Sequence, residues 1–107
     1  MLDFETYQNL ADNTSGAYDD KQARTVVAAL GLAGEAGEYA NLVKKFAAHG
    51  HDIRREEFVD ELGDVLWYVA EAATSLGLRL DDIALANIDK LQKRYGGKFT
   101  QEKSINR

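Results

Sequence analysis

The stretch that decides the fold contains Glu35-Ala-Gly-Glu38 and, after a spacer, Glu61-Leu-Gly-Asp64. Each signature places two carboxylates three residues apart, and residues at this spacing share one face of an α-helix. If two such helices pack side by side, four carboxylates converge on one small volume. Because uncompensated carboxylates in a half-buried site repel one another, the arrangement requires a cation. Ligands that offer only oxygen suit a hard ion, Mg²⁺ or its substitute Mn²⁺, rather than Zn²⁺.

The first signature lies within a run of three glycines, Gly31, Gly34 and Gly37. Each glycine costs roughly 1 kcal/mol relative to alanine in a helix interior. We expect close approach of another backbone or of a ligand to offset this cost. The sequence therefore predicts crowding at the acidic site.

Apolar residues at helical spacing predict four helices, at about 3–14, 20–48, 55–76 and 80–95. The third is expected to carry a core stripe of Phe58, Leu62, Val65, Val69, Ala72 and Leu76. No strand alternation is convincing, and the absence of proline permits long uninterrupted helices. The predicted fold class is therefore all-α and four-helix bundle-like.

A chain of 107 residues is expected to form a single helical domain, with residues 98–107 as an extended tail. Asp3 is the expected N-cap of the first helix, and Gly77 is the expected residue just past the end of the third. Residues 48–55, centred on Gly50, are predicted to form a loop.

Charge and composition exclude several classes of protein. The formal net charge is −5, from 13 basic and 18 acidic residues, which argues against a partner such as duplex nucleic acid. The chain has no cysteine, which excludes a disulfide framework and fits a reducing cytoplasm. No stretch approaches the roughly 18 apolar residues of a membrane span, and the first residues do not resemble a secretion signal. We therefore expect a cytoplasmic protein without a membrane partner.

Cationic and amide side chains accompany the acidic signatures. Lys45 lies on the carboxylate face of the second helix, about two turns further on. A polar row on the fourth helix consists of Asn87, Lys90 and Arg94. Such donors, together with Mg²⁺, suit a phosphate chain. A neighbouring carboxylate could then take a proton from an attacking water, which would be hydrolysis of a phosphoanhydride.

Simpler interpretations exist for each of these features. A single Glu-x-x-Glu pair is usually solvated, and Lys45 and the polar row are more often merely exposed. Trp67 and Tyr68 can stack on a base, although packing is their more usual role. Two loop histidines, His49 and His51, are more often solvated than bound to metal. The helical segments lack the Glu-x-x-His pattern of di-iron bundles, which disfavours iron.

The sequence resembles the MazG-like family of all-α nucleoside triphosphate pyrophosphohydrolases. The likeness covers nearly the whole chain and centres on residues 6–8, 31–38, 44–45, 60–68 and 87–95. The family pattern is Glu-Glu-x-x-Glu, a variable spacer and Glu-x-x-Asp. Gly34 stands at the first glutamate of that pattern, so the identity of the general base stays open.

The resemblance implies Mg²⁺ bound by Glu35, Glu38, Glu61 and Asp64, and cleavage between the α and β phosphates of a (deoxy)nucleoside triphosphate. The products would be a nucleoside monophosphate and pyrophosphate, as in house-cleaning of nucleotide pools. The implied phosphate or nucleotide contacts are Lys45, Asn87, Lys90, Arg94 and Tyr95. The resemblance also implies a homodimer or a dimer of dimers, with the site near the subunit interface.

Two alternatives to this function stay open. A close relative acting on phosphoribosyl-ATP would use the same metal chemistry. A non-catalytic helical oligomerisation or regulatory module would keep the acidic cluster as a structural cation site. Base preference is not fixed by the sequence, and Tyr7, Gln8 and Trp67 are the side chains considered for it.

Overall fold

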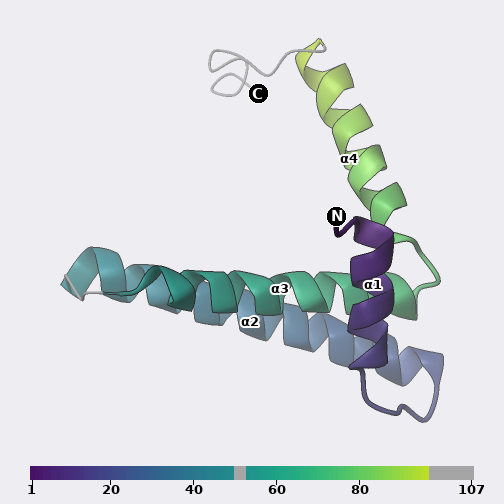
Figure 1. Cartoon of the computed structure of the whole chain (residues 1–107), viewed down its shortest axis with the longest axis horizontal. Coiled ribbons are helices and arrows are strands. Elements are labelled where there is room, and N and C mark those ends of the chain that lie inside the picture. Colours follow the sequence, from purple (N-terminus) through teal and green to yellow (C-terminus); the bar gives the residue numbers. More distant parts are fainter. Residues whose placement is uncertain (50–52, 97–107) are drawn as a thin grey trace.

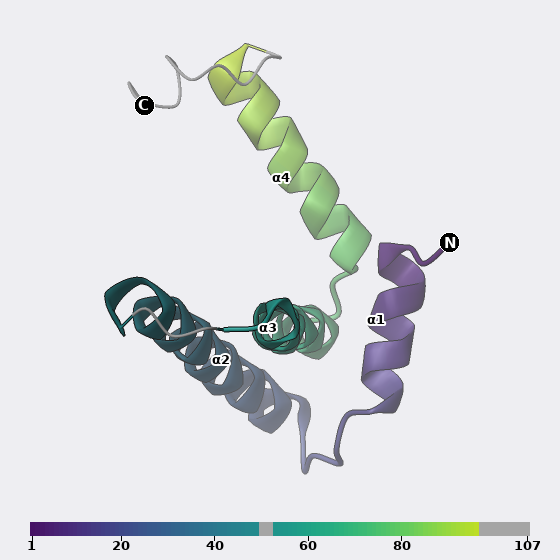
Figure 2. The same ribbon diagram turned by 60° about the vertical axis from the view of Figure 1, so that its left-hand side comes forward.

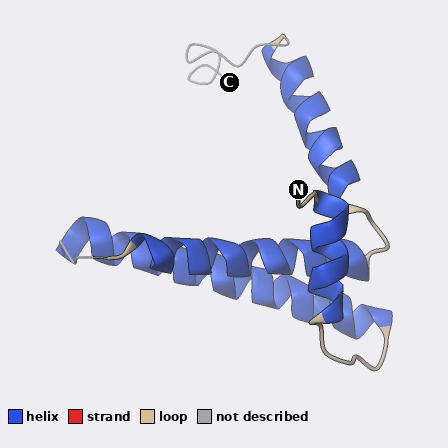
Figure 3. Cartoon of the chain, in the orientation of Figure 1, coloured by secondary structure: helices blue, strands red, loops and turns tan. Residues whose placement is uncertain are grey.

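Four helices make up the described part of the chain, residues 1–49 and 53–96, in a computed structural model. They are α1 (Phe4–Asn13), α2 (Lys21–His49), α3 (Arg55–Ser75) and α4 (Leu80–Tyr95). No strand occurs among these residues (Figure 3). The predicted all-α class is confirmed, and the helix bounds lie close to the predicted ones. The expected tail at 98–107 lies outside the described residues, as does the centre of the predicted loop at 50–52.

The helix ends follow from local sequence. The Asp3 side chain accepts a hydrogen bond of 2.7 Å from the backbone N–H of Thr6, which confirms the predicted N-cap of α1. At the end of α3, Gly77 has a φ of 70°, and the N–H of Leu78 donates back to the carbonyl of Ala73 at 2.9 Å. This pattern is a Schellman motif, which needs a left-handed residue where only glycine fits without strain. The chain therefore turns sharply before α4.

The helices form an open assembly rather than a closed bundle. α2 and α3 make a long antiparallel hairpin, and α1 packs across α3 (Figure 1). α4 packs on α1 and projects away from the hairpin (Figure 2). The expected four-helix bundle-like closure is therefore not found within one chain. Its physical reason is the short turn after α3, which directs α4 outward beside α1 instead of back along the hairpin.

The core lies where α1, α3 and the start of α4 meet. Its buried members are Ala11, Ala70 and Leu80, with Tyr7, Trp67 and Val69 packed against them. The predicted stripe on α3 is only partly covered, because Leu62 and Leu76 are 49% and 54% exposed. Small side chains are buried on α3, while several larger apolar ones face outward, since none of the helices in residues 1–49 and 53–96 covers that side.

The side-chain amide of Gln8 helps to hold α1 to the turn between α3 and α4. The Gln8 side-chain N–H₂ donates to the Thr74 hydroxyl at 3.1 Å and to the Leu78 carbonyl at 2.9 Å. Its carbonyl oxygen accepts from the backbone N–H of Leu80 at 2.8 Å. With these bonds Gln8 joins three elements, so its role in the chain is structural, and it caps an N–H at the start of α4.

A buried ion pair fastens α2 to α3. The Glu71 side chain is 2% exposed and accepts from Arg24 at 2.7 and 3.3 Å and from the Ser15 hydroxyl at 2.8 Å. The same guanidinium contacts Asp12 at 2.6 Å. These partners, with Glu71 foremost, raise the pKa of Arg24 above its already high value. Sequence reasoning missed this cluster, although a glutamate within the apolar run 69–73 is its signal.

Candidate metal centre

Three carboxylates from the two hairpin helices meet at one point. α2 supplies Glu35, and α3 supplies Glu61 and Asp64. One oxygen of each residue lies within 4.8 Å of the others. Glu35 and Glu61 are half-buried, whereas Asp64 is exposed. The helical spacing and the side-by-side packing of α2 and α3 are sufficient to place these oxygens around a common centre.

Glu38, the fourth predicted ligand, lies outside this three-oxygen group. It is exposed and sits one turn beyond Glu35 on α2. Its charge still acts on the cluster, because it is one of the carboxylates that raise the pKa of Glu61. The structure thus brings three of the four predicted ligands together and leaves the fourth at the edge.

Electrostatics of the cluster favour a bound cation. Desolvation, followed by the charges of Glu35 and Asp64, raises the pKa of Glu61 above its ordinary value. Among the residues that the structure describes, no lysine or arginine forms an ion pair with these carboxylates. The donor set contains oxygen alone, which fits a hard divalent ion such as Mg²⁺ or Mn²⁺ and does not fit a soft one.

One of the three glycines is required by close packing at the centre. A Cβ atom on Gly31 would overlap the ring of Tyr68, so the ring can lie against α2 only because residue 31 has no side chain. In contrast, Cβ atoms on Gly34 and Gly37 would meet no atom within 4 Å among the described residues. Among the described residues, the expected crowding is therefore found at Gly31 and not at Gly34 or Gly37.

Aromatic side chains border the centre. Desolvation, and then the negative charge of Asp64, raise the pKa of Tyr7 on α1. Trp67 packs edge-on against Tyr68 with ring centroids 4.9 Å apart, and its indole N–H donates to the Thr14 hydroxyl at 2.8 Å. Trp67 therefore fastens the end of α1 to α3, which agrees with the expectation that packing is its main role.

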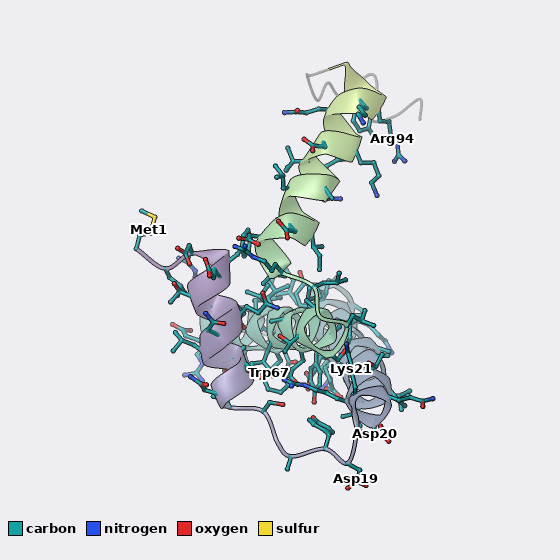
Figure 4. All side chains as sticks on the ribbon, turned by 90° about the vertical axis from the view of Figure 1, so that its right-hand side faces the viewer. Met1, Asp19, Asp20, Lys21, Trp67 and Arg94 are labelled. Carbon is teal, nitrogen blue, oxygen red and sulfur yellow. The ribbon has the colours of Figure 1, made fainter. Side chains whose placement is uncertain are left out.

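The predicted phosphate-binding residues do not reach the carboxylates within one chain. Lys45 is exposed and lies ten residues beyond Glu35, or about 15 Å along the helix axis. Three members of the α4 set are exposed, namely Asn87, Lys90 and Arg94. Figure 4 shows Arg94 near the far end of α4, well separated from Trp67 on α3. Tyr95 is 1% exposed and is part of the packing at the end of α4. His51, the second loop histidine, lies outside the described residues.

Comparison with known proteins identifies the family of the chain. The model of the MazG nucleotide pyrophosphohydrolase domain matches residues 25–99, which include all four predicted ligands and the polar row of α4. The chain therefore belongs to the MazG family of nucleotide pyrophosphohydrolases, and the resemblance found in the sequence is confirmed.

A viral protein gives the second comparison. The chain is 37% identical over 111 residues to the gene 37 protein of Mycobacterium phage L5, covering 96% of this chain and 97% of that one. No solved structure matches the chain. Among the described residues, no helix is long and apolar enough to cross a membrane.

Proposed function

We propose that the chain hydrolyses nucleoside or deoxynucleoside triphosphates to a nucleoside monophosphate and pyrophosphate, with Mg²⁺ as its cofactor. The observation that carries this proposal is the meeting of three carboxylate oxygens from Glu35, Glu61 and Asp64 in a chain of the MazG family. Bound there, Mg²⁺ would supply charge neutralisation for the phosphate chain and would make a nearby water more acidic.

The chain's own residues would then bind, orient and move a proton. Water forms the new bond to phosphorus, the oxygen that bridges the α and β phosphates leaves with pyrophosphate, and a carboxylate accepts the proton of the water. Glu38 is our candidate for this acceptor, because it lies beside the three-oxygen group without belonging to it. Gly34, at the position where the family pattern has a further glutamate, has no side chain to take that role.

Product analysis tests the proposal directly. The full chain would be incubated with each canonical ribo- and deoxyribonucleoside triphosphate and with phosphoribosyl-ATP, in Mg²⁺ and in EDTA. We expect monophosphate and pyrophosphate in equal amounts, only with the metal. Release of diphosphate and orthophosphate, or no product from any substrate, would contradict the proposal. Turnover of phosphoribosyl-ATP alone would favour the alternative in which the chain is a phosphoribosyl-ATP pyrophosphohydrolase.

Two variants separate metal binding from proton transfer. Glu35→Gln should abolish both turnover and Mn²⁺ binding, whereas Glu38→Gln should lower turnover by about 100-fold or more and retain most Mn²⁺ binding. Glu56→Gln is a matched control, since Glu56 is an exposed glutamate in the first turn of α3, away from the cluster. Equal loss of Mn²⁺ binding in Glu35→Gln and Glu38→Gln would make Glu38 a ligand instead of the proton acceptor.

A further inference from the structure

An aromatic ring separates the two hairpin helices beside the acidic centre. The Tyr68 ring of α3 lies against the backbone of Gly31 on α2, where a Cβ atom would overlap the ring atoms Cδ1, Cε1 and Cζ. Along α2, Gly31 lies four residues before Glu35. Along α3, Tyr68 lies four residues after Asp64. Because the two helices are antiparallel (Figure 1), the ring contact lies one turn, or about 6 Å, from the carboxylates.

The seat of this ring fixes the register of the two helices as well as their distance. If α2 slid by one turn in either direction, the ring would meet the side chain of Val27 or of Glu35 instead of a glycine. Trp67 packs edge-on against the ring with centroids 4.9 Å apart, and its indole N–H is bound to the Thr14 hydroxyl. The ring therefore has a defined place, and added volume on α2 at this point acts on the spacing of the helices.

The carboxylates of the centre depend on that spacing. Glu35 comes from α2, whereas Glu61 and Asp64 come from α3, and their oxygens lie within 4.8 Å of one another. Mg²⁺ binds oxygen at about 2.0–2.1 Å and tolerates little deviation, so two oxygens on one ion lie at most about 4 Å apart. The centre has no spare width, because a wider hairpin would place the Glu35 oxygen beyond the reach of an ion held by α3.

We propose that Gly31 and Tyr68 are positioning residues of the metal centre. The ring, seated on a bare stretch of backbone, sets the distance and register at which α2 presents Glu35 to the two carboxylates of α3. Neither residue touches the ion, and both act through the helices that carry its ligands. This role explains why a residue unfavourable in a helix interior occupies position 31. The inference rests on the metal centre of the proposed function and specifies what holds its two halves together.

Mn²⁺ binding without nucleotide, followed by electron paramagnetic resonance, tests the positioning role. Gly31→Ala favours the helix itself, yet we expect it to weaken Mn²⁺ binding by about 10-fold or more, the usual scale for residues that orient metal ligands. Gly34→Ala is the matched control. It makes the same change on the same helix, next in sequence to Glu35, where a Cβ atom meets nothing within 4 Å among the described residues. This control should bind Mn²⁺ like the wild type.

Substitutions of Tyr68 separate the role of its ring from that of its hydroxyl. Tyr68→Phe keeps the ring and should bind Mn²⁺ normally, whereas Tyr68→Leu loses the ring and should bind the ion more weakly. The double variant with Gly31→Ala and Tyr68→Leu exchanges volume across the contact, because the new methyl group takes part of the space that the ring leaves. It should bind Mn²⁺ more tightly than Gly31→Ala alone, a recovery that a general loss of stability would not give.

Three outcomes would overturn the positioning role: undiminished Mn²⁺ binding by Gly31→Ala, equal losses in Tyr68→Phe and Tyr68→Leu, or no recovery in the double variant. If circular dichroism shows that Gly31→Ala does not fold, the comparison of Tyr68→Phe with Tyr68→Leu decides in its place. The binding assay contains no nucleotide, so a failed product analysis leaves its result standing. Absence of Mn²⁺ binding by the wild type would instead overturn the metal centre as a whole, and the positioning role with it.

Discussion

Two acidic clusters in this chain are balanced in different ways. Glu71 is almost fully buried, and Arg24 and Ser15 satisfy its oxygens within the same chain. At the other end of the contact between α2 and α3, Glu35, Glu61 and Asp64 meet without a described cationic side chain. The first cluster is complete and stabilises the fold. The second raises the pKa of Glu61, and in our proposal it is balanced by a divalent cation from outside the chain.

Replacing a carboxylate of the cluster formed by Glu35, Glu61 and Asp64 should have the largest effect, and the effect should be on activity. We expect Glu61→Gln to lower kcat/KM for the preferred triphosphate by about a thousand-fold, because both metal binding and phosphate positioning are lost. The fold should persist, as circular dichroism would show. Activity within a few-fold of wild type would contradict the assignment of Glu61, and Glu56→Gln provides the control.

Breaking the balanced cluster should instead affect stability. Glu71→Gln removes the buried negative charge opposite Arg24 and replaces one of the two accepting oxygens with an N–H₂ donor, so the free energy of unfolding should fall by about 2 kcal/mol. Asp12→Asn should cost less than about 1 kcal/mol, since the Asp12 side chain is 48% exposed. Urea unfolding at constant metal measures both values. Equal effects of the two substitutions would show that burial does not distinguish the two partners.

A smaller loss of stability is expected at the junction of α1 and α4. Gln8→Ala removes the acceptor of the Leu80 N–H and the donor to Thr74, which should cost about 1–2 kcal/mol. Gln8→Glu keeps an acceptor for the Leu80 N–H but turns a carboxylate oxygen toward the Leu78 carbonyl, so at neutral pH it should be no more stable than Gln8→Ala. If Gln8→Ala changed base preference with unaltered stability, Gln8 would belong to the nucleotide site instead.

The smallest predicted effect is a pH-dependent difference in stability without metal. Folding raises the pKa of the Glu61 carboxyl, so keeping that group charged in the native state lowers the free energy of unfolding. This loss of stability disappears as pH falls through the raised pKa towards 4.5, the ordinary value, because the group is then neutral in both the folded and the unfolded chain. In EDTA at neutral pH, Glu61→Gln should therefore unfold at a slightly higher temperature than wild type, and the difference should vanish below pH 4.5. In Mg²⁺ the order should reverse. Thermal unfolding in both buffers measures it.

Much of the fold was predictable because helix signals are local. Asp3, Gly77 and the apolar periodicity define where helices begin and end, and the Glu-x-x-Glu and Glu-x-x-Asp spacings define which carboxylates share a face. The direction of α4 was not predictable, since it depends on the turn after α3 and on Gln8, whose bonds span about seventy residues of sequence.

Two further features depend on contacts between helices, which local sequence patterns do not determine. The pairing of Arg24 with Glu71 is a contact between helices, and only the register of α2 against α3 determines it. The apolar periodicity of α3 placed Leu62 in the core, but Leu62 is exposed. Its burial depends on which helix packs against that side of α3, and the pattern of α3 itself does not determine this. The resemblance indicated the roles of the α4 residues, but the structure places that helix away from the centre that they would serve.

The most direct test of the account is Mn²⁺ binding followed by electron paramagnetic resonance, without nucleotide. We predict that wild type and Glu56→Gln bind the ion alike, and that Glu35→Gln and Asp64→Asn lose most of this binding while remaining folded. Equal Mn²⁺ binding by wild type and by both ligand variants would contradict a metal centre at the meeting point of α2 and α3.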